Sequence, residues 1–402
     1  MSEGLRSPVW LMGPWLVFAC QGSADSNGLG AGGTAGSDHA GGTSAGGTSA
    51  AGGNTTGDTS SAGGGASGAT SAGAGPTSGG MGSGGASGSN GAASASGAAG
   101  SGSSGPPVSL DLTGAITQVH DPDIIEENGT FYLFSTGEGV QVRTSTDLHA
   151  WTSAGQVFAT KPAWITTTAA SDPNALWAPE VAYFGGKYHL YYAASSFGSQ
   201  SSCIGHATRT SLATGNWTDL GAATICSTAA DNWNAIDPHP FLDEAGHGWL
   251  ALGSFWTGLK LIRLDDNGNR DGPDFFSLAT RENTAVEAAF IVFHAGYYYL
   301  FESVDYCCKG VNSTYKIMVG RAASVTGPYV DQSGTALSSG GGTLVLSSGT
   351  RWIGPGHNAI LHTFGRDYNV YHSYDAESGG TPTLRISEMD WSSDGWPISA
   401  GP

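Results

Sequence analysis

The chain has 402 residues and a formal net charge of −18, a balance that argues against nucleic acid or an anionic membrane surface as its partner. Its 65 glycines are concentrated near the N-terminus, so composition already divides the sequence into parts that must be interpreted separately. The spacing of its five cysteines does not match a zinc site.

The first twenty residues have the features of an export signal. An apolar stretch from Pro8 to Ala19 follows a single basic residue, Arg6, and ends at Cys20. The stretch is too short to span a bilayer but suits the core of a signal peptide. Its ending "VFAC" resembles a bacterial lipobox, so we expect residues 1–20 to be a signal peptide or a lipoprotein signal ending at Cys20. Ordinary secretion and a misassigned start codon are the alternatives.

Residues 21–107 form a linker made almost entirely of Gly, Ala, Ser and Thr. Such a segment lacks the apolar surface that would offset the entropy of ordering it, so we expect it to be disordered. As a flexible tether it would span on the order of 50 Å. We therefore expect an extracellular protein or one held at the outer cell surface, with a membrane contact only through a lipid anchor at Cys20.

Residues 108–402 form the globular part, and their pattern indicates strands. Short runs rich in Val, Ile, Tyr, Phe and Trp are separated by Gly, Asn and Asp, without a sustained helical period. One group recurs five times, beginning near residues 121, 179, 237, 287 and 356, each with an apolar strand, a turn and an aromatic strand. Such self-similarity is typical of a β-propeller. The predicted fold is all-β, a five-bladed β-propeller preceded by the tether.

The opening of each repeat carries an acidic or imidazole side chain. These residues are Asp121, Glu180, Asp237, Glu287 and His357. If each opens the innermost strand of its blade, all five side chains approach the central channel. Acidic groups are seldom buried together unless a reaction or a cation needs them. The alternative is that each merely caps a turn where a strand begins.

Carboxyl groups that face one another suit acid–base chemistry on a sugar. One can stay protonated as a general acid while another stays ionised as a base. Two such groups about 6.5 to 9.5 Å apart leave room for a water molecule and invert the anomeric centre in glycoside hydrolysis. Aromatic residues in "LWAPE", "SSFG", "NWNAID" and "GSFWTG" adjoin the openings, and their faces suit sugar rings, although core packing is the alternative. We predict a carbohydrate-active site.

An ordered series of motifs carries a resemblance to a known family. The series is "HDPDII", "LWAPEV", "WNAIDPHPF", "GSFWTGLKL", "VEAAFI", "YYYLFES", "CCKGVNSTYKIMVGRAASVTGPY" and "GPGHNAI". It closely resembles the endo-acting arabinanases of glycoside hydrolase family 43, over about residues 115–398. The resemblance implies a five-bladed propeller, expected as a monomer, that cleaves internal α-1,5-L-arabinofuranosyl linkages of arabinan with inversion.

The resemblance also implies a role for each acidic residue. Asp121 of "HDP" corresponds to the general base, and Glu287 of "EAAF" corresponds to the general acid. Asp237 of "AIDP" corresponds to the residue that orients the acid and tunes its pKa. Ala289 stands where proline is common, a departure that leaves the carboxyl group in place. Glu180 matches an acidic residue that supports the site without reacting itself.

A metal ion and several sugar contacts are further implications of the resemblance. His357 of "GHN" corresponds to a histidine beside a bound cation, usually taken as calcium. One imidazole cannot complete a shell of six to eight oxygens, so water is expected to supply most ligands. The candidates for sugar contacts are Trp177, Phe197, Asn234 and Trp256.

Two aspartates beside the repeat openings are expected to have structural positions. Asp123 shares a strand face with Asp121 by period-two alternation, yet the family motif does not require it. Asp172 in "ASDPNALW" precedes the opening of its own repeat, so it is expected to lie in a turn.

The cysteines of the globular part fall into two pairs. Cys203 and Cys226 could form a disulfide in an oxidising compartment, although the sequence does not give their distance. The adjacent Cys307 and Cys308 match a family feature beside the groove.

Two other functions stay open at this point. Exo-acting arabinofuranosidases and β-xylosidases of the family use the same three carboxyl groups. The longer motif series favours endo cleavage, as does the end at Pro402, without the β-sandwich that many xylosidases append. A sugar-binding propeller without activity is the alternative of another class, but binding alone would not require an acid and a base.

Overall fold

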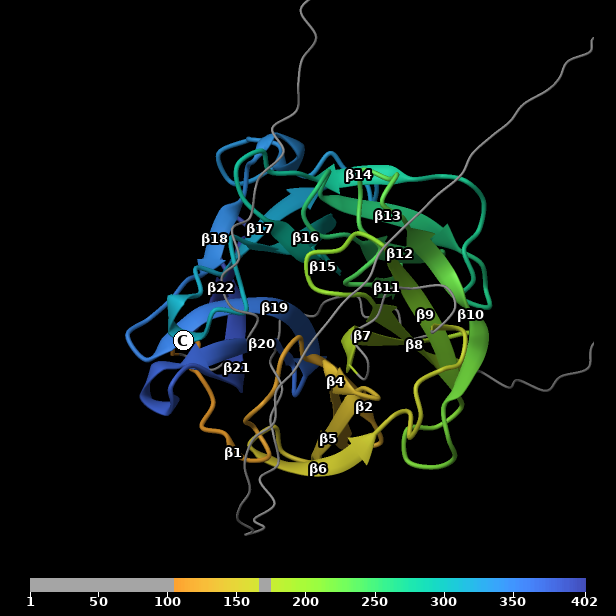
Figure 1. The fold of residues 1–402 in the computed structure, drawn as a ribbon. Helices are drawn as coiled ribbons and strands as arrows, with labels where there is room; N and C mark the ends of the chain where they lie inside the picture. Colours follow the sequence, from red (N-terminus) through yellow and green to blue (C-terminus); the bar gives the residue numbers. More distant parts are fainter. Residues whose placement is uncertain (1–104, 166–174) are drawn as a thin grey trace, which may run out of the picture. The chain divides into compact units, whose positions relative to one another are not determined.

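Five separate β-sheets make up residues 105–165 and 175–402, which are the residues that the computed structural model describes. The sheets are arranged around a common centre (Figure 1), and the predicted five-bladed β-propeller is confirmed. The leader, nearly all of the tether and the turn expected at Asp172 lie outside the described residues.

Each blade is a meander of four main strands. The first blade contains β1 (Thr113–Gly114), β2 (Asp123–Glu127), β3 (Thr130–Ser135), β5 (Gln141–Ser145) and β6 (Ala150–Gln156). The second contains β4 (Gly137–Glu138), β7 (Ala175–Phe184), β8 (Lys187–Ala194), β9 (Ser202–Arg209) and β10 (Thr218–Ser227). The third contains β11 (His239–Leu242), β12 (Gly248–Leu252), β13 (Leu259–Leu264) and β14 (Phe276–Ala279). The fourth contains β15 (Val286–His294), β16 (Tyr297–Val304), β17 (Lys316–Ala322) and β18 (Thr343–Leu346). The fifth contains β19 (Trp352–Thr363), β20 (Arg366–Asp375), β21 (Thr381–Trp391) and β22 (Pro397–Ser399).

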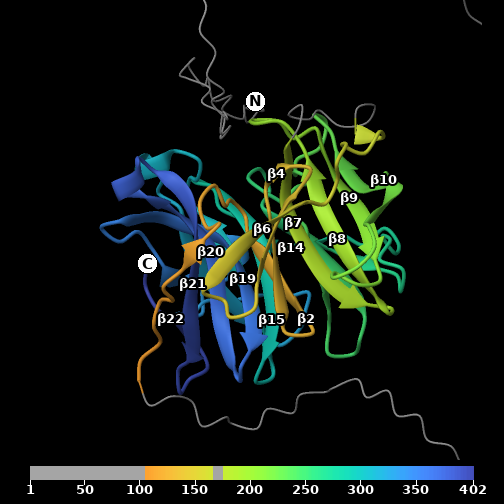
Figure 2. The same cartoon turned by 90° about the horizontal axis from the view of Figure 1, so that it is seen from below.

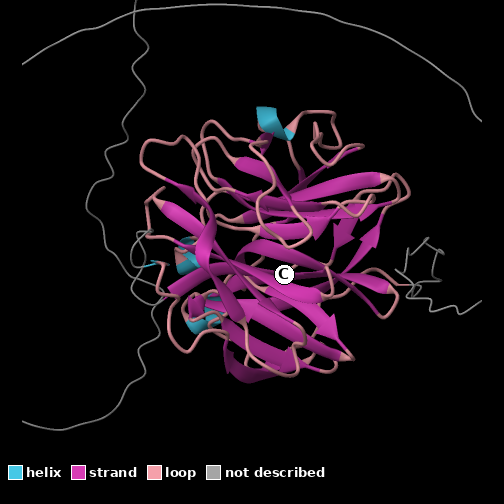
Figure 3. Ribbon diagram, turned by 90° about the vertical axis from the view of Figure 1, so that its right-hand side faces the viewer, coloured by secondary structure: helices cyan, strands magenta, loops and turns pink. Residues whose placement is uncertain are grey.

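Three short 3₁₀ turns lie among the described residues. They are η1 (Gly310–Asn312), η2 (Leu337–Ser339) and η3 (Ala376–Ser378), and Figure 3 shows them as small cyan segments among the strands. Within the described part of the chain, no helix has the length and apolarity needed to cross a membrane.

Two-residue turns explain how the sequence forms the first hairpin of a blade. Asn128 and Gly129 join β2 to β3, and both adopt positive φ, at 53° and 78°. This is the backbone of the tight hairpin turn that matches the twist of its strands, and Asn-Gly is its preferred sequence. The corresponding turns at 185–186, 295–296 and 364–365 also have positive φ at both positions.

The innermost strand of each blade lies next to the centre of the propeller; these strands are β2, β7, β11, β15 and β19. β2 contacts β7, β7 contacts β11, β11 contacts β15, β15 contacts β19, and β19 returns to β2. Figure 2 shows β2, β15 and β19 next to one another in a second view. Residues at the start of these strands are therefore brought together although the sequence separates them widely.

The apolar core is divided among the seams between blades. Phe134 of β3 belongs to the same buried cluster as Tyr192 of β8, which joins the first and second blades. Another cluster contains Phe131 of β3, Phe301 of β16 and Tyr371 of β20, and so joins the first, fourth and fifth blades. Because each cluster joins neighbouring blades, packing fixes the blades relative to one another.

Residues 108–117 close the ring between the last blade and the first. Leu110 N–H donates to the carbonyl of Ile386, and Leu384 N–H donates to the carbonyl of Ile116, so this segment lies along β21. The segment also includes β1, which pairs in parallel with β6 of the first blade. The N-terminal segment of the propeller domain thus joins the last blade to the first.

A disulfide joins Cys203 of β9 to Cys226 of β10, where the two residues are partners in the strand register. The pairing that the sequence left open is therefore present. Cys307 and Cys308 have free thiols.

The backbone corrects the alignment of the repeat openings. One residue with positive φ precedes the regular pairing in every blade; these residues are Asp121, Ala178, Asp237, Ala288 and His357. Glu180 lies two residues after this position, and Glu287 lies one residue before it. An alignment based on acidic side chains could not detect this backbone feature. The five predicted openings are consequently not strictly equivalent.

Candidate active site

Asp121 is held at the start of the first blade by three neighbouring side chains. The hydroxyl of Thr136 donates to Oδ2 at 2.5 Å, and Oδ1 lies 2.8 Å from Nδ1 of His120 and 3.2 Å from Nδ1 of His357. Burial opposes ionisation of this carboxyl group, but the two imidazoles outweigh it and hold the pKa of Asp121 well below its usual range. Asp121 is therefore expected to be a carboxylate.

Glu287 lies on β15 and has the opposite tendency. The hydroxyl of Ser254 donates to Oε2 at 2.7 Å, and the hydroxyl of Tyr315 donates to Oε1 at 2.9 Å. Burial raises the pKa of Glu287 above its usual value, although both hydrogen bonds favour the charged form. Glu287 therefore keeps its proton to a higher pH than Asp121 does.

Asp237 supports the backbone next to Glu287. Its Oδ2 accepts a hydrogen bond of 3.0 Å from the backbone N–H of Ala288, the residue that follows Glu287. Burial raises the pKa of Asp237 well above its usual range, and the charges of Glu287 and Asp121 add to the effect while His357 opposes it. Asp237 thereby fixes the strained backbone next to Glu287, where Ala288 has a φ of 56°.

Glu180 and Asp123 belong to a buried cluster that also includes His239. Each of these three residues lies two positions after the residue with positive φ in its blade. Because side chains alternate along a strand, the three therefore lie at the same level, further along their strands. Asp123 accepts the backbone N–H of Val181 at 2.7 Å, which ties the first blade to the second. Burial, together with the neighbouring carboxyl group of Glu180, raises the pKa of Asp123 to about 8. The contacts of Asp123 agree with the structural position expected for it.

The pair of Glu180 and His239 is best described as neutral. Nδ1 of His239 lies 2.5 Å from Oε2 of Glu180, and Nε2 lies 3.1 Å from the carbonyl oxygen of Ile291. Since a carbonyl only accepts, Nε2 carries a proton. Burial raises the pKa of Glu180 well above its usual range and lowers the pKa of His239 to about 4. A protonated Glu180 therefore donates to Nδ1 of a neutral His239.

His357 faces Asp121 from the fifth blade, and its backbone N–H donates to Ser303 Oγ at 2.8 Å. Burial opposes charge on this imidazole, yet Asp121, Asp237 and Glu180 raise its pKa to about 9. The groups whose ligand atoms converge closely enough for a metal ion, among the described residues, are His120 with Cys307 and Cys308, and His120 with Asp121 and His372. His357, the predicted metal ligand, belongs to neither group.

The predicted sugar-contact residues differ in exposure. Phe197 is 83% exposed and meets the half-buried Trp177 edge to face, with ring centroids 6.1 Å apart. Trp256 is 42% exposed and lies two residues after Ser254, the partner of Glu287. Asn234 is buried, and its side-chain oxygen has no hydrogen-bond partner among the described residues. Trp177, Phe197 and Trp256 thus offer ring surface to a ligand, whereas Asn234 does not offer an exposed face.

Four residues that contact the carboxyl groups were not singled out from the sequence. They are His120, Thr136, Ser254 and Tyr315. His120 adjoins Asp121 in the "HDP" motif, and Ser254 lies in "GSFWTG", so both had a local signal. Tyr315 lies in the "CCKGVNSTY" motif and had a signal of the same kind, whereas Thr136 lies outside the motifs of the family series.

Two buried carboxyl groups whose pKa values are shifted in opposite directions suit acid–base catalysis. Residues 115–397 match the glycosyl hydrolases of family 43. The chain therefore belongs to this family, as the motifs predicted.

Relatives with known names support the assignment. The extracellular endo-α-(1→5)-L-arabinanase 1 of Bacillus subtilis is 42% identical over 302 residues, which cover 73% of this chain and 92% of the relative. The extracellular exo-α-(1→5)-L-arabinofuranosidase of Cellvibrio japonicus is 38% identical over 306 residues, covering 72% of this chain and 88% of the relative.

Solved structures share the fold. The GH43 endo-arabinanase from Bacillus licheniformis has a TM-score of 0.69 and 44% identity, over 72% of this chain and 99% of the other. The Cellvibrio cellulosa α-L-arabinanase complexed with arabinohexaose has a TM-score of 0.68 and 38% identity, over 71% and 96%.

Proposed function

We propose that this chain is a secreted arabinanase that cleaves internal α-1,5-L-arabinofuranosyl linkages with inversion. The observation that carries the proposal is the opposite direction of two pKa shifts: two imidazoles lower the pKa of Asp121, and burial raises the pKa of Glu287. The substrate class comes from the relatives named above, whose names describe an arabinanase and an arabinofuranosidase that act on α-(1→5) linkages.

In the proposed reaction Asp121 is the general base and Glu287 is the general acid. The carboxylate of Asp121 takes a proton from a water molecule, whose oxygen forms a bond to the anomeric carbon. Glu287 gives its proton to the glycosidic oxygen as the bond between that oxygen and the anomeric carbon breaks. Loss of a proton from Asp121 and gain of one by Glu287 restore the starting state.

The surroundings of the two groups suit these tasks. Asp121 must be oriented and ionised, and Thr136, His120 and His357 supply both conditions. Glu287 must keep its proton until the leaving oxygen needs it, and its burial supplies this. Asp237 positions the acid through the backbone of Ala288.

A calcium ion is part of the proposal, with His357 as its protein ligand. Nδ1 of His357 faces Asp121, which leaves Nε2 for a metal ion. Carboxyl oxygens of Asp121, Asp237 and Glu180 lie close enough to act on the charge of His357, and an oxygen-rich setting suits a hard cation. Water would supply most of the ligands. When bound, the ion would add positive charge next to the base.

Endo cleavage is favoured over exo cleavage because a tryptophan is close in sequence to the hydrogen-bond network of each of the two carboxyl groups. Trp177 directly precedes Ala178, whose N–H donates to Thr136 beside Asp121, whereas Trp256 follows Ser254 beside Glu287. A chain that contacts both rings would continue past the reacting linkage in each direction. The exo-acting relative keeps exo cleavage as the second candidate.

Export is proposed from the leader and from relatives that are named extracellular. The mature protein would begin at Cys20 with a lipid, or beyond the leader without one. Mass analysis of the mature N-terminus distinguishes the two.

The decisive experiment follows the products formed from linear debranched arabinan. Short oligomers at early times support endo cleavage, and arabinose as the sole early product would establish the exo candidate. Retained binding without any release of sugar would refute the enzymatic proposal. NMR of the first product, recorded before mutarotation, would contradict inversion if the anomeric configuration were retained.

A further inference from the structure

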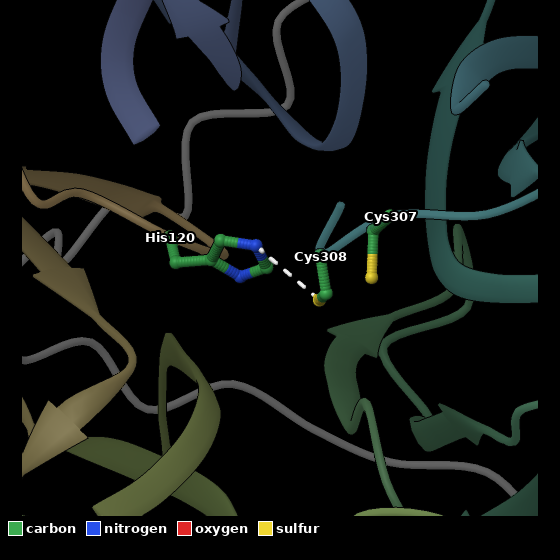
Figure 4. A group of neighbouring side chains, drawn as sticks. All are labelled: His120, Cys307 and Cys308. Atoms are coloured by element: carbon green, nitrogen blue, oxygen red, sulfur yellow. Dashed lines mark hydrogen bonds between the residues drawn. The ribbon is translucent and has the colours of Figure 1, made fainter. Parts of the chain in front are cut away.

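A cluster of one imidazole and two thiols lies beside the proposed base, and the proposed reaction uses neither thiol. His120 precedes Asp121 at the start of the first blade, while Cys307 and Cys308 lie between β16 and η1 of the fourth blade. Figure 4 shows the His120 ring and the Cys308 side chain directed toward each other, with Cys307 next to Cys308. The ligand atoms of all three residues lie within 4.8 Å of one another.

The spacing matches what a tetrahedral zinc ion requires. Zinc bonds of about 2.3 Å to sulfur and about 2.0 Å to nitrogen place two ligand atoms roughly 3.5 Å apart across a tetrahedral angle. The Sγ atom of Cys308 lies 3.7 Å from Nε2 of His120. The pair therefore needs almost no movement to share one ion.

The other ring nitrogen of His120 already has the partner that metal-binding histidines use. Nδ1 lies 2.8 Å from the carboxylate of Asp121, and such a hydrogen bond fixes the tautomer that leaves Nε2 free to bind a metal ion. Nε2 lies 2.7 Å from the hydroxyl of Tyr374. That hydroxyl also accepts the backbone N–H of Cys308 at 2.7 Å, so it would keep one partner if an ion replaced its contact with the ring.

Access and ligand type are consistent with binding of a soft or borderline cation. Both cysteine side chains and His120 are only partly buried, so an ion can reach them from solvent. Two sulfur ligands and one imidazole select zinc-like cations over calcium or magnesium, which prefer oxygen.

We propose that His120, Cys307 and Cys308 form a binding site for a thiophilic divalent cation of the zinc class. The two thiols would bind as thiolates and release their protons to solvent, and a water molecule or a substrate oxygen would take the fourth position. Because His120 contacts Asp121, the ion would lie next to the base and inhibit hydrolysis reversibly. This last consequence rests on the proposed function, whereas the binding itself does not.

Binding is tested on the full-length protein after reduction with a phosphine and removal of the reductant. Zinc affinity is measured by competition with a chromophoric chelator, and cobalt(II) serves as a spectroscopic substitute. We expect one ion bound through this site, a thiolate-to-cobalt absorption band, and at least about a 100-fold loss of affinity in Cys307→Ser/Cys308→Ser, because two of the three ligands are removed. The exposed His362→Ala is the matched control and should bind as the unmodified protein does.

Two results would overturn the site. One is zinc affinity that does not change in the double serine variant while circular dichroism shows that the variant is folded. The other is a cobalt spectrum without a thiolate band. His120→Asn provides a second, independent variant, which should weaken binding even where both thiols remain.

Inhibition is measured separately, as the ratio of arabinan hydrolysis with and without zinc for each protein. We expect zinc to inhibit the unmodified enzyme, a chelator to reverse this, and the double serine variant to lose the sensitivity. Zinc binding in a protein that does not hydrolyse arabinan would uphold the site and reject the proposed function, so the two failures are distinguishable.

Discussion

The hydroxyl of Thr136 donates a 2.5 Å hydrogen bond to Asp121 and accepts another, of 2.8 Å, from the backbone N–H of Ala178. One side chain of the first blade thus connects the proposed base to the second blade. The orientation of Asp121 consequently depends on the seam between the two blades as well as on its own strand.

Substitutions in this pair test the assignment of the base. Asp121→Asn should lower kcat by about 10² to 10⁴, the usual contribution of a general base. Thr136→Val should lower it by about 10-fold, since the value of one hydrogen bond to a charged group is about 1.5 kcal/mol. Thr136→Ser keeps the hydroxyl and should retain most activity. Near-normal turnover by Asp121→Asn would remove Asp121 from the base role.

Glu287 and Tyr315 give a prediction for the pH dependence. A general acid must be protonated, so activity falls as the pH rises through the pKa of Glu287, which burial raises. The Tyr315 hydroxyl stabilises the carboxylate, so Tyr315→Phe should raise that pKa further. We expect the alkaline limb of kcat/KM to move to higher pH by up to about one unit.

The control for this shift is Tyr183→Phe, because Tyr183 is exposed on β7. A shift to lower pH in Tyr315→Phe would contradict the assignment of the acid. Glu287→Gln should abolish the alkaline limb and lower kcat by about 10² to 10⁴.

The neutral pair of Glu180 and His239 predicts an asymmetry between two substitutions. Glu180→Gln keeps a donor for Nδ1 of His239 and should change the free energy of unfolding by less than about 1 kcal/mol. Glu180→Ala leaves that nitrogen unpaired in a buried site and should cost about 1–3 kcal/mol. Urea denaturation measures both. Equal losses would indicate that Glu180 is ionised and paired with an imidazolium.

His357 carries the proposed calcium site. His357→Ala should reduce bound calcium after dialysis, measured by elemental analysis, and should lower activity, because Asp121 loses one of its imidazole partners. His362→Ala is the control. A cation content that does not change in His357→Ala would place the calcium site elsewhere.

The disulfide between Cys203 and Cys226 predicts a loss of stability on its removal. It closes a loop with a sequence separation of 23, for which the chain-entropy relation gives about 3 kcal/mol. Cys203→Ser/Cys226→Ser should therefore unfold at a lower temperature. A reductant should lower the melting temperature of the unmodified protein and leave that of the variant unchanged. Insensitivity of the unmodified protein would show that the bond adds little.

The sequence predicted equivalent positions correctly where a polar residue of the motif is also the residue with positive φ at the start of its blade. Asp121, Asp237 and His357 were aligned as openings, and each occupies the positive-φ position of its blade. Glu180 and Glu287 were aligned by their charge alone, and the backbone displaces both from that position. The hydrogen bond from Tyr315 to Glu287 joins residues 28 positions apart in sequence. Contacts of this kind depend on packing between strands, which no motif records.

The closing segment described above has a consequence for the timing of folding. Ser109 forms a hydrogen bond with Ser387 across 278 positions, and residues 108–117 leave a ribosome long before β21 exists. Earlier blades can pair their own strands as they emerge, but the seam must wait for the end of synthesis. Contacts between such distant partners slow folding because the loop-closure entropy is lost before they form. Until residues 108–117 dock, the unfinished ring therefore has an unpaired edge on its last blade.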